Sequence, residues 1–589
     1  MSTNENPSFF WQAVRNNVKL QRKTPAITPA NRSQVLPLSL GQQRLWQLEQ
    51  LQIHNTVHNL RAAFRLQGAL EVAVLNQCLQ AIVQRHEVLR TEFPARGTKA
   101  SQFILPELTI DLPLVSLENR SRADQELAIV TYAGEETQLP FDLEQAPLLR
   151  FKLLRLSPEE HVLIRTTHHI VYDMWSDSVF MRELAVLYKD FLQGDASSLP
   201  PLPIQYADFA AFQQQHIDTQ NVLAYWQQHL AGQLPLLALP VDYGAQFGYH
   251  GETEYQQLNP ELSQTLSVLA RQQGTSLFVV LLAAFKALLF QYTQQEDMLL
   301  CSPVAGRYQV ETKKLIGFFN NLLLLRNDLS GDPSFTELLA RVSQVTLDAT
   351  AHQDLPLQAL SDSLGIPANL LSRVMFTLQN VPAMPEKMAD VAISRLDIEE
   401  GIANFDLSVS IREKDGGYVV IARYKTELFN RDSIQTLLAR YLDLLGIVAT
   451  EPTIQLSQLP TFAYTPMTLS SASVYIAPVT ELEKTVAEVW QDVLQRQQIG
   501  LYDDFFSVGG SSLAMLQVNT QLEKRLNRSC AIVELFKQPT VSAMAAYLAA
   551  TETTHEPALD VDAFKQRANQ RRNALSQQKQ LKSRRPQHD

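Results

Sequence analysis

The amino-acid sequence predicts a large region of mixed α/β fold, followed by a small all-helical bundle. The first observation is length, because 589 residues exceed what one compact core usually organises. The second is pattern: strand-like and helix-like segments alternate over about residues 36–452, whereas apolar residues over 477–550 recur at helical spacing only. Residues 453–476 are rich in Ser, Thr and Pro, which is typical of a linker between two domains.

The two ends of the chain have patterns of their own. Within residues 1–35, Phe10, Val14 and Val18 share one helical face, which predicts a short helix followed by a linker. Residues 551–589 form a basic tail. We expect either end to serve for docking, the helix in an apolar groove and the tail on an acidic partner. The alternative for the tail is a solvated end.

Composition excludes several classes of function. A net charge of −11 argues against a general nucleic-acid binder. The longest apolar run, from Leu277 to Phe290, is interrupted by Lys286 and is too short to span a bilayer, which predicts a buried core helix. Three well-separated cysteines without a CxxC pair favour a reducing compartment and give no thiolate metal site. With no secretory signal visible, we expect a cytoplasmic protein without a membrane or nucleic-acid partner.

Two adjacent histidines, His168 and His169, follow a buried-strand pattern at residues 162–164. Ser176 or Asp177 is then placed to cap a helix. Because successive strand residues point to opposite faces, we expect one imidazole to face the core and the other a cleft. Three interpretations follow from the residues alone. A metal site is disfavoured because no HExxH or third-ligand spacing accompanies the pair, whereas buried core histidines and acid/base chemistry stay open.

A second motif is Gly509-Gly510-Ser511-Ser512-Leu513, just before a helical pattern. The glycine pair permits a tight turn, so that Ser512 begins the helix. The positive end of a helix favours an anionic phosphate, which suits a phosphodiester link to the Ser512 hydroxyl. The alternative is that Ser512 or Ser511 merely caps the helix.

Taken together, these motifs resemble the condensation and peptidyl carrier domains of nonribosomal peptide synthetases. The resemblance runs from about Pro37 to Ala550, in the family's order. Besides the two motifs above, the similar stretches are Ser39–Trp46, Arg85–Thr91, Tyr206–Phe209, Pro303–Arg307, Ile316–Leu322, His352–Pro356 and Phe376–Asn380 in the larger region, and Pro478–Leu513 and Pro539–Val541 in the bundle.

The resemblance implies a fold and a reaction. The fold would have two lobes, each similar to chloramphenicol acetyltransferase, with an N lobe at about 36–200 and a C lobe at about 201–452. A tunnel between them would admit two phosphopantetheine arms. A carrier domain at 477–550, a four-helix bundle, would bear 4′-phosphopantetheine on Ser512. The domain would join an upstream carrier-bound acyl or peptidyl thioester to a carrier-bound aminoacyl thioester through an amide bond.

The resemblance also implies roles for individual residues. His169 would face the reaction centre and act as a base or positioning group, whereas His168 would be buried and structural. Asp173 would pair with Arg90 and hold the loop in shape. Arg90 and Asn321 are therefore expected to be supporting residues, and no metal is expected. The residues around the motif are similar to those of condensation domains that join L-configured donors to L-configured acceptors.

One residue departs from the family pattern. Met174 stands where the family has glycine after the aspartate, although Trp175 and Ser176 still match. A methionine side chain is expected to narrow the tunnel or shift the loop. Two alternative functions follow: an ester-forming condensation domain, and a non-catalytic scaffold that presents the carrier to enzymes acting in trans.

The resemblance implies several partners. No segment of this sequence fits an adenylation domain, so we expect an adenylation enzyme to load Ser512 in trans. A phosphopantetheinyl transferase, an upstream donor carrier domain, and a downstream synthetase or releasing enzyme complete the expected set.

Overall fold

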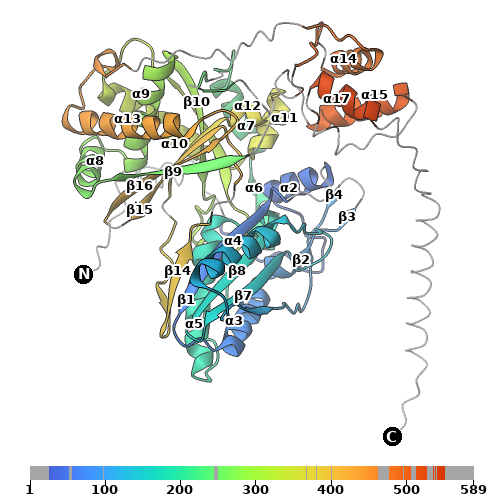
Figure 1. Cartoon of the computed structure of the whole chain (residues 1–589), viewed down its shortest axis with the longest axis vertical. Helices are drawn as coiled ribbons and strands as arrows, with labels where there is room; N and C mark the ends of the chain where they lie inside the picture. The colour runs from blue at the N-terminus through green and yellow to red at the C-terminus, as the bar shows by residue number, and fades with distance from the viewer. Residues whose placement is uncertain are drawn as a thin grey trace. The chain divides into compact units, whose positions relative to one another are not determined.

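The structure, a computed structural model, describes residues 25–550 apart from gaps, the longest of which are 52–55, 244–249, 462–475 and 527–534. The predicted N-terminal helix and the basic tail therefore lie outside the described residues. The chain divides into two compact units near residue 471, and each is described separately (Figure 1).

The first sheet of the larger unit is six-stranded and carries helices on both faces. Phe64 and Leu163 face a core shared with helices α3 and α5, whereas Ala63 and Ile164 face α4, as strand alternation requires. The strand order is β13 (Lys387–Met388), β14 (Val391–Leu396), β1 (Asn59–Gln67), β8 (Glu160–His168), β7 (Leu149–Ser157) and β6 (Leu114–Ser116), and the helices are α3 (Val72–Arg85), α4 (Arg122–Gln138) and α5 (Met174–Leu192).

The second sheet is also six-stranded and belongs to the later part of the same unit. Its strand order is β11 (Asn321–Asp328), β10 (Asp297–Val304), β12 (Val374–Gln379), β15 (Leu407–Lys414), β16 (Gly417–Lys425) and β9 (Gly251–Leu258). Packed with it are α8 (Pro260–Gln272), α9 (Leu277–Thr293), α10 (Phe335–Ala351) and α13 (Arg431–Thr450). The larger unit also has shorter elements outside the two sheets. They are α2 (Leu40–Leu51), α6 (Tyr206–His216), α7 (Thr219–His229), α11 (Leu357–Leu364), α12 (Ala368–Leu371) and the small strands β2 (Thr91–Glu92), β3 (Ala95–Arg96), β4 (Lys99–Ala100) and β5 (Phe103–Ile104).

Helix α9 confirms the expected core helix. Its side chains from Val279 to Leu289 are all buried, including Lys286, whose Nζ donates to the Leu325 carbonyl at 2.8 Å. In the described part of the chain no single helix is long and apolar enough to cross a membrane; α8 and α9 meet those criteria only as a pair bent by 104°.

The boundary between the predicted lobes differs from the one drawn at residue 200. Strand β14 lies far along the chain, yet it pairs antiparallel with β1, with Ala63 opposite Leu396. Helix α6 likewise buries Tyr206 and Phe209 in the core of the first sheet. The two halves are therefore interlaced, because a later segment of chain covers the edge that β1 would otherwise expose.

Segments predicted as linkers also pack onto the larger unit. Ile27 is buried in the first core, and Arg32 forms ion pairs with Glu87 at 2.7 Å and Asp208 at 2.6 Å. At the other end Leu456 and its apolar neighbours in 454–459 belong to the second core. The folded unit thus extends from at least residue 27 to residue 459, beyond the predicted range of 36–452.

The second unit is helical, as predicted, and has a core of its own. The helices described are α14 (Glu481–Leu494), α15 (Ser512–Leu526) and α17 (Val541–Ala550). Trp490 is fully buried and meets Phe505 edge-on, with ring centroids 4.8 Å apart. Apolar side chains of all three helices close this core.

Candidate active site

The histidine pair lies at the predicted junction of strand and helix. Strand β8 ends at His168, a single 3₁₀ turn covers His169–Val171, and α5 begins at Met174. The cap of α5 differs from the prediction, because it is Asp173 rather than Ser176 or Asp177. Asp173 Oδ1 accepts from the Ser176 amide at 2.9 Å, and Ser176 completes a capping box.

His169 is fixed in one tautomer. Its Nδ1 lies 2.6 Å from the Tyr172 carbonyl oxygen, which can only accept, so Nδ1 carries the proton and Nε2 carries a lone pair. The ring meets Phe318 edge-on at 4.6 Å between centroids. Burial lowers the pKa of His169 to about 4, so the imidazole is neutral at pH 7. No hydrogen bond joins Nε2 to another residue that the structure describes.

His168 points the other way and is 1% exposed. Its Nδ1 accepts from the Ile170 amide at 3.1 Å, so its Nε2 bears the proton and faces Glu49 Oε1 at 3.4 Å. Burial lowers the pKa of His168. One imidazole is thus in the core and the other is partly exposed, although His169 belongs to the 3₁₀ turn and not to the strand; the cleft expected beside it stays a prediction.

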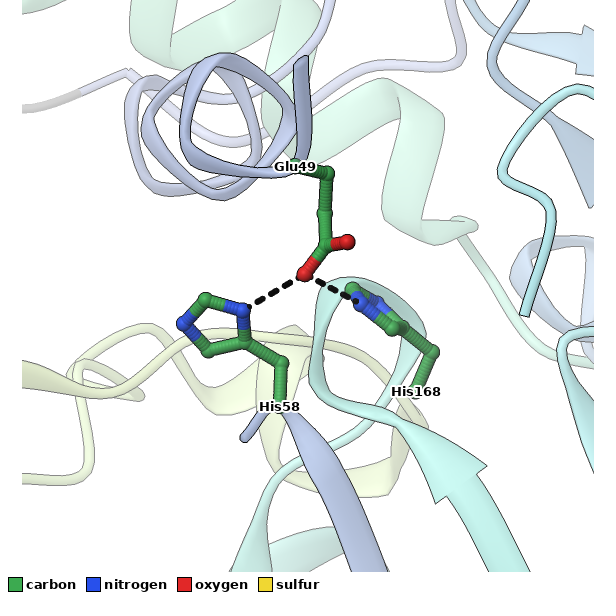
Figure 2. A group of neighbouring side chains, drawn as sticks. All are labelled: Glu49, His58 and His168. Carbon is green, nitrogen blue, oxygen red and sulfur yellow. Dashed lines mark hydrogen bonds and ion pairs between the residues drawn. The ribbon is translucent and has the colours of Figure 1, made fainter. Parts of the chain in front are cut away.

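Glu49 joins His168 to a third histidine (Figure 2). The same Oε1 lies 2.7 Å from His58 Nδ1, and the His58 carbonyl accepts from the His169 amide at 2.8 Å. Burial alone would raise the pKa of Glu49, but its bonds with His168 and His58 outweigh burial and lower it. No local sequence pattern indicated Glu49 and His58, because His58 reaches the motif through the pairing of β1 with β8, and Glu49 reaches it from helix α2.

These three side chains also raise the question of a metal site. Their ligand atoms lie within 4.8 Å of one another, which is the third-ligand geometry that sequence spacing did not reveal. However, the Ile170 amide already occupies His168 Nδ1, so a metal at Nε2 would require an imidazole without any proton. The arrangement therefore favours a hydrogen-bonded triad over metal ligation.

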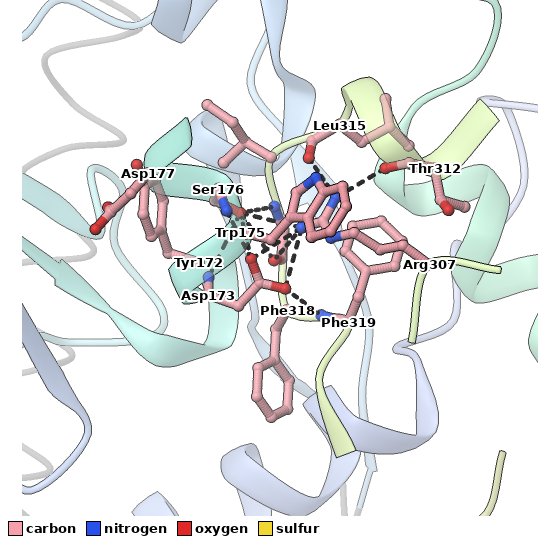
Figure 3. A network of polar contacts seen from close by, with 12 residues as sticks. Tyr172, Asp173, Trp175, Ser176, Asp177, Arg307, Thr312, Leu315, Phe318 and Phe319 are labelled. Atoms are coloured by element: carbon pink, nitrogen blue, oxygen red, sulfur yellow. Dashed lines mark hydrogen bonds and ion pairs between the residues drawn. The ribbon is translucent and has the colours of Figure 1, made fainter. Parts of the chain in front are cut away.

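Asp173 pairs with Arg307, and the predicted pairing with Arg90 is wrong (Figure 3). Arg307 Nη2 donates to both carboxylate oxygens at 2.9 and 3.0 Å, and both side chains are buried. Arg307 Nη1 donates to the carbonyls of Thr312 and Leu315. Arg307 lay in a motif that the sequence singled out, Pro303–Arg307, but no pattern indicated its partner 134 residues away.

The two predicted supporting residues have different contacts. Arg90 donates to the carbonyl oxygens of Leu105 and Gln84, so it holds the segment beside it rather than the histidine loop. Asn321 Nδ2 donates to the Gln353 and Leu355 carbonyls, both at 2.7 Å. Asn321 therefore ties the start of β11 to the His352–Pro356 motif.

Several motifs that are distant in sequence meet at the loop. Ser176 Oγ accepts from the Gly317 amide at 3.1 Å, and the Tyr206 hydroxyl donates to the Phe318 carbonyl at 2.5 Å. Ser39 bonds the same hydroxyl at 2.8 Å. Gly317 has φ +155°, and a Cβ there would lie 2.1 Å from the Tyr206 ring, so no larger residue fits. Motifs that are far apart in the sequence thus pack into one cluster at the histidine loop.

Met174 lies at the start of helix α5. It is the first residue of α5, is 48% exposed, and has no positive φ. Met174 therefore sits in the helix without backbone strain, and the expected shift of the loop stays a prediction. The tunnel stays a prediction. Two cavities of the larger unit, of about 800 and 250 Å³, are lined by other residues, among them His229 and Tyr292 respectively.

Ser512 is the first residue of α15, which confirms the predicted start of this helix. Residues 509–511, the rest of the glycine motif, lie outside the described residues.

Comparisons with known proteins agree with this arrangement. A family model for the condensation domain matches residues 32–465, and one for a phosphopantetheine attachment site matches residues 484–548. Tyrocidine synthase 3 of Brevibacillus parabrevis is 34% identical over 443 residues, which are 74% of this chain and 7% of that protein. Malpinin synthetase of Mortierella alpina is 37% identical over 419 residues, 70% of this chain and 5% of that protein. The chain thus spans less than a tenth of the length of these relatives.

Solved structures share the fold of the larger unit. The X-domain in complex with OxyB from teicoplanin biosynthesis has a TM-score of 0.66 and 27% identity, covering 75% of this chain and 99% of that one. The first condensation domain of the calcium-dependent antibiotic synthetase has a TM-score of 0.62 and 20% identity, covering 73% of this chain and all of that one. The chain therefore belongs to the condensation-domain family of nonribosomal peptide synthetases, and a phosphopantetheine-binding carrier domain follows its condensation domain.

Proposed function

We propose that this protein joins an acyl or peptidyl thioester on an upstream carrier domain to the amine of a carrier-bound aminoacyl thioester, forming an amide bond. The observation that supports this most directly is the state of His169. Its imidazole is neutral, its Nδ1 proton is committed to the Tyr172 carbonyl, and its Nε2 lone pair is left available. A base for an attacking amine needs that state.

The reaction needs little from the protein beyond the positioning of its two substrates. The amine nitrogen attacks the thioester carbon, the carbon–sulfur bond breaks, and the donor thiol leaves with a proton. His169 would take the proton from the amine and pass it to the departing sulfur, a contribution of about 10²–10⁴-fold. Holding both substrates in place can supply up to roughly 7–11 kcal/mol of the barrier.

The carrier domain would hold its substrate on phosphopantetheine attached to Ser512. Ser512 lies inside the matched attachment domain and begins a helix of 15 residues, where the positive helix end favours the phosphate. The group would supply a thiol that carries the acyl chain as a thioester. A phosphopantetheinyl transferase would install it, an adenylation enzyme in trans would load it, and a downstream synthetase or releasing enzyme would take the product.

The test is His169→Ala in a reconstituted reaction with a loaded donor carrier and a loaded Ser512, followed by mass spectrometry of the carrier-bound product. We expect the rate to fall by about 10²–10⁴-fold while the melting temperature is kept. The matched control is His216→Ala, since His216 Nδ1 also bonds a backbone carbonyl, at 3.1 Å, but lies on α6. An unchanged rate in His169→Ala would reject the proposed role.

A second candidate function is a scaffold that recruits an enzyme acting in trans. It is favoured by the similarity to the X-domain, whose solved structure is a complex with OxyB. Under this alternative the parent protein forms no carrier-bound amide with any donor, although Ser512 is still modified. The same mass-spectrometric assay on the parent therefore separates the two functions. The assay also detects an ester product, because mild base cleaves an ester and leaves an amide intact.

A further inference from the structure

The orientation of His169 depends on Tyr172, which lies between His169 and Asp173 in the loop. Besides its carbonyl contact with Nδ1, the Tyr172 amide donates to the His169 carbonyl at 3.2 Å. Tyr172 is 1% exposed, and its side chain runs into the protein behind the loop. Both peptide groups of Tyr172 are thus engaged with His169, so whatever fixes the Tyr172 side chain also fixes the imidazole.

Arg165 and Asp177 both interact with the Tyr172 side chain, and the contacts of Arg165 are the more extensive. Arg165 lies on β8, and its guanidinium is 2% exposed. Nη1 donates to the Tyr172 hydroxyl at 2.6 Å, and the guanidinium carbon lies 4.2 Å from the centre of the Tyr172 ring. The tyrosine is therefore held at its hydroxyl and across its face by one cation.

Asp177 holds Arg165 in turn and is itself paired with a second cation, Arg395. Asp177 on α5 lies 2.6 Å from Arg165 Nη2 and 2.9 Å from Arg395 Nη1, and Arg395 belongs to β14. Burial alone would lower the pKa of Arg165, but the charge of Asp177 and the contact with Tyr172 outweigh it and raise the pKa. A buried charge of this kind is poor evidence for stability, because apolar packing often does as well. Orientation is the better explanation for it.

We propose that Arg165 is a positioning residue for His169 and acts through Tyr172. The inference rests on the proposed function, in which His169 Nε2 accepts a proton. If the Tyr172 ring were released, its peptide could turn and the carbonyl could leave Nδ1. The other tautomer, with the proton on Nε2, would then be accessible, and that tautomer cannot accept a proton from an amine at Nε2.

The experiment uses Tyr172→Phe and Arg165→Lys in the full chain with loaded carriers. Each is expected to lower kcat by roughly 10-fold, within the contribution of a positioned base, with KM for both carriers unchanged. In a His169→Ala background neither substitution should lower the remaining rate further, because the effect passes through His169. Spectra of ¹⁵N-histidine-labelled Tyr172→Phe should show a larger fraction of His169 protonated at Nε2.

Tyr188→Phe is the matched control. It also removes a buried hydroxyl, one that accepts from the Glu71 amide at 2.8 Å, but it does not touch His169. We expect it to keep kcat even where it lowers the melting temperature as much as Tyr172→Phe does. The inference is overturned if Tyr172→Phe and Arg165→Lys keep kcat, or if they lower the rate equally with and without His169. If His169→Ala itself keeps the parent rate, the proposed function has failed instead, and the positioning role falls with it.

Discussion

At the scale of single residues, the buried ion pair Asp173–Arg307 constrains the histidine loop. Both side chains are at most 2% exposed, so removing one partner leaves a buried charge without compensation. We predict that Asp173→Asn lowers the free energy of unfolding by about 3–5 kcal/mol, measured by urea denaturation. Arg90→Ala is the control and should cost only about 1 kcal/mol, since Arg90 bonds two carbonyl oxygens away from the loop. Equal losses in the two variants would contradict this assignment of partners.

Lys286 gives a residue-scale prediction about pH. Burial lowers its pKa from an ordinary 10.5 to about 7. Between about pH 7 and 10.5 the unfolded chain therefore binds a proton that the folded chain does not, so stability rises with pH by up to about 1.4 kcal/mol per unit. Lys286→Met should remove this dependence, visible as a flatter series of urea midpoints at pH 7, 8 and 9. The exposed Lys189→Met should keep the parent's slope; an equal slope in Lys286→Met would refute the prediction.

At the scale of elements, the start of α5 decides whether Met174 matters. The capping box of Asp173 and Ser176 is intact, and Met174 occupies the first helical position with ordinary backbone angles. We predict that Met174→Gly leaves the condensation rate within about twofold and lowers the unfolding free energy by up to about 1 kcal/mol, the cost of glycine in a helix. Met174→Ala separates the two effects, because it removes the side chain without that cost. A rate that rises several-fold in both variants would show that the methionine obstructs the substrate.

The same elements show what the sequence can and cannot predict. Strand β8, the turn and α5 were predictable because their patterns are local, and so was the buried helix α9. The position of Arg307 beside Asp173 was not, since nothing local records a contact across 134 residues. The lobe boundary failed for the same reason, because β14 joins the first sheet only through its pairing with β1. In the candidate site the residue types were predictable from motif order, but their partners, such as Glu49 for His168, were not.

At the scale of the whole molecule, the two units have separate cores. Among the described residues the clusters of the larger unit lie within 27–459, and the cluster of the carrier unit lies within 482–548. A domain with its own core can fold alone. We therefore expect each unit to fold without the covalent connection, and we expect the connection to raise the effective concentration of the carrier to about the millimolar range.

This separation leads to a prediction for residues 1–465 and 472–589 produced as two chains. A transferase with coenzyme A should add one phosphopantetheine to the second chain, and Ser512→Ala should abolish the addition while Ser511→Ala keeps it. Modification should proceed as in the full chain, because it needs only the carrier core.

Condensation onto a substrate held at Ser512 should instead be slow when the two chains are mixed at micromolar concentration. Its rate should rise with the concentration of the carrier chain, since the tether no longer supplies a high effective concentration. Following product by mass spectrometry over a carrier titration tests this directly. A rate that equals the full chain's at every concentration would mean that the two units bind each other tightly without their connection.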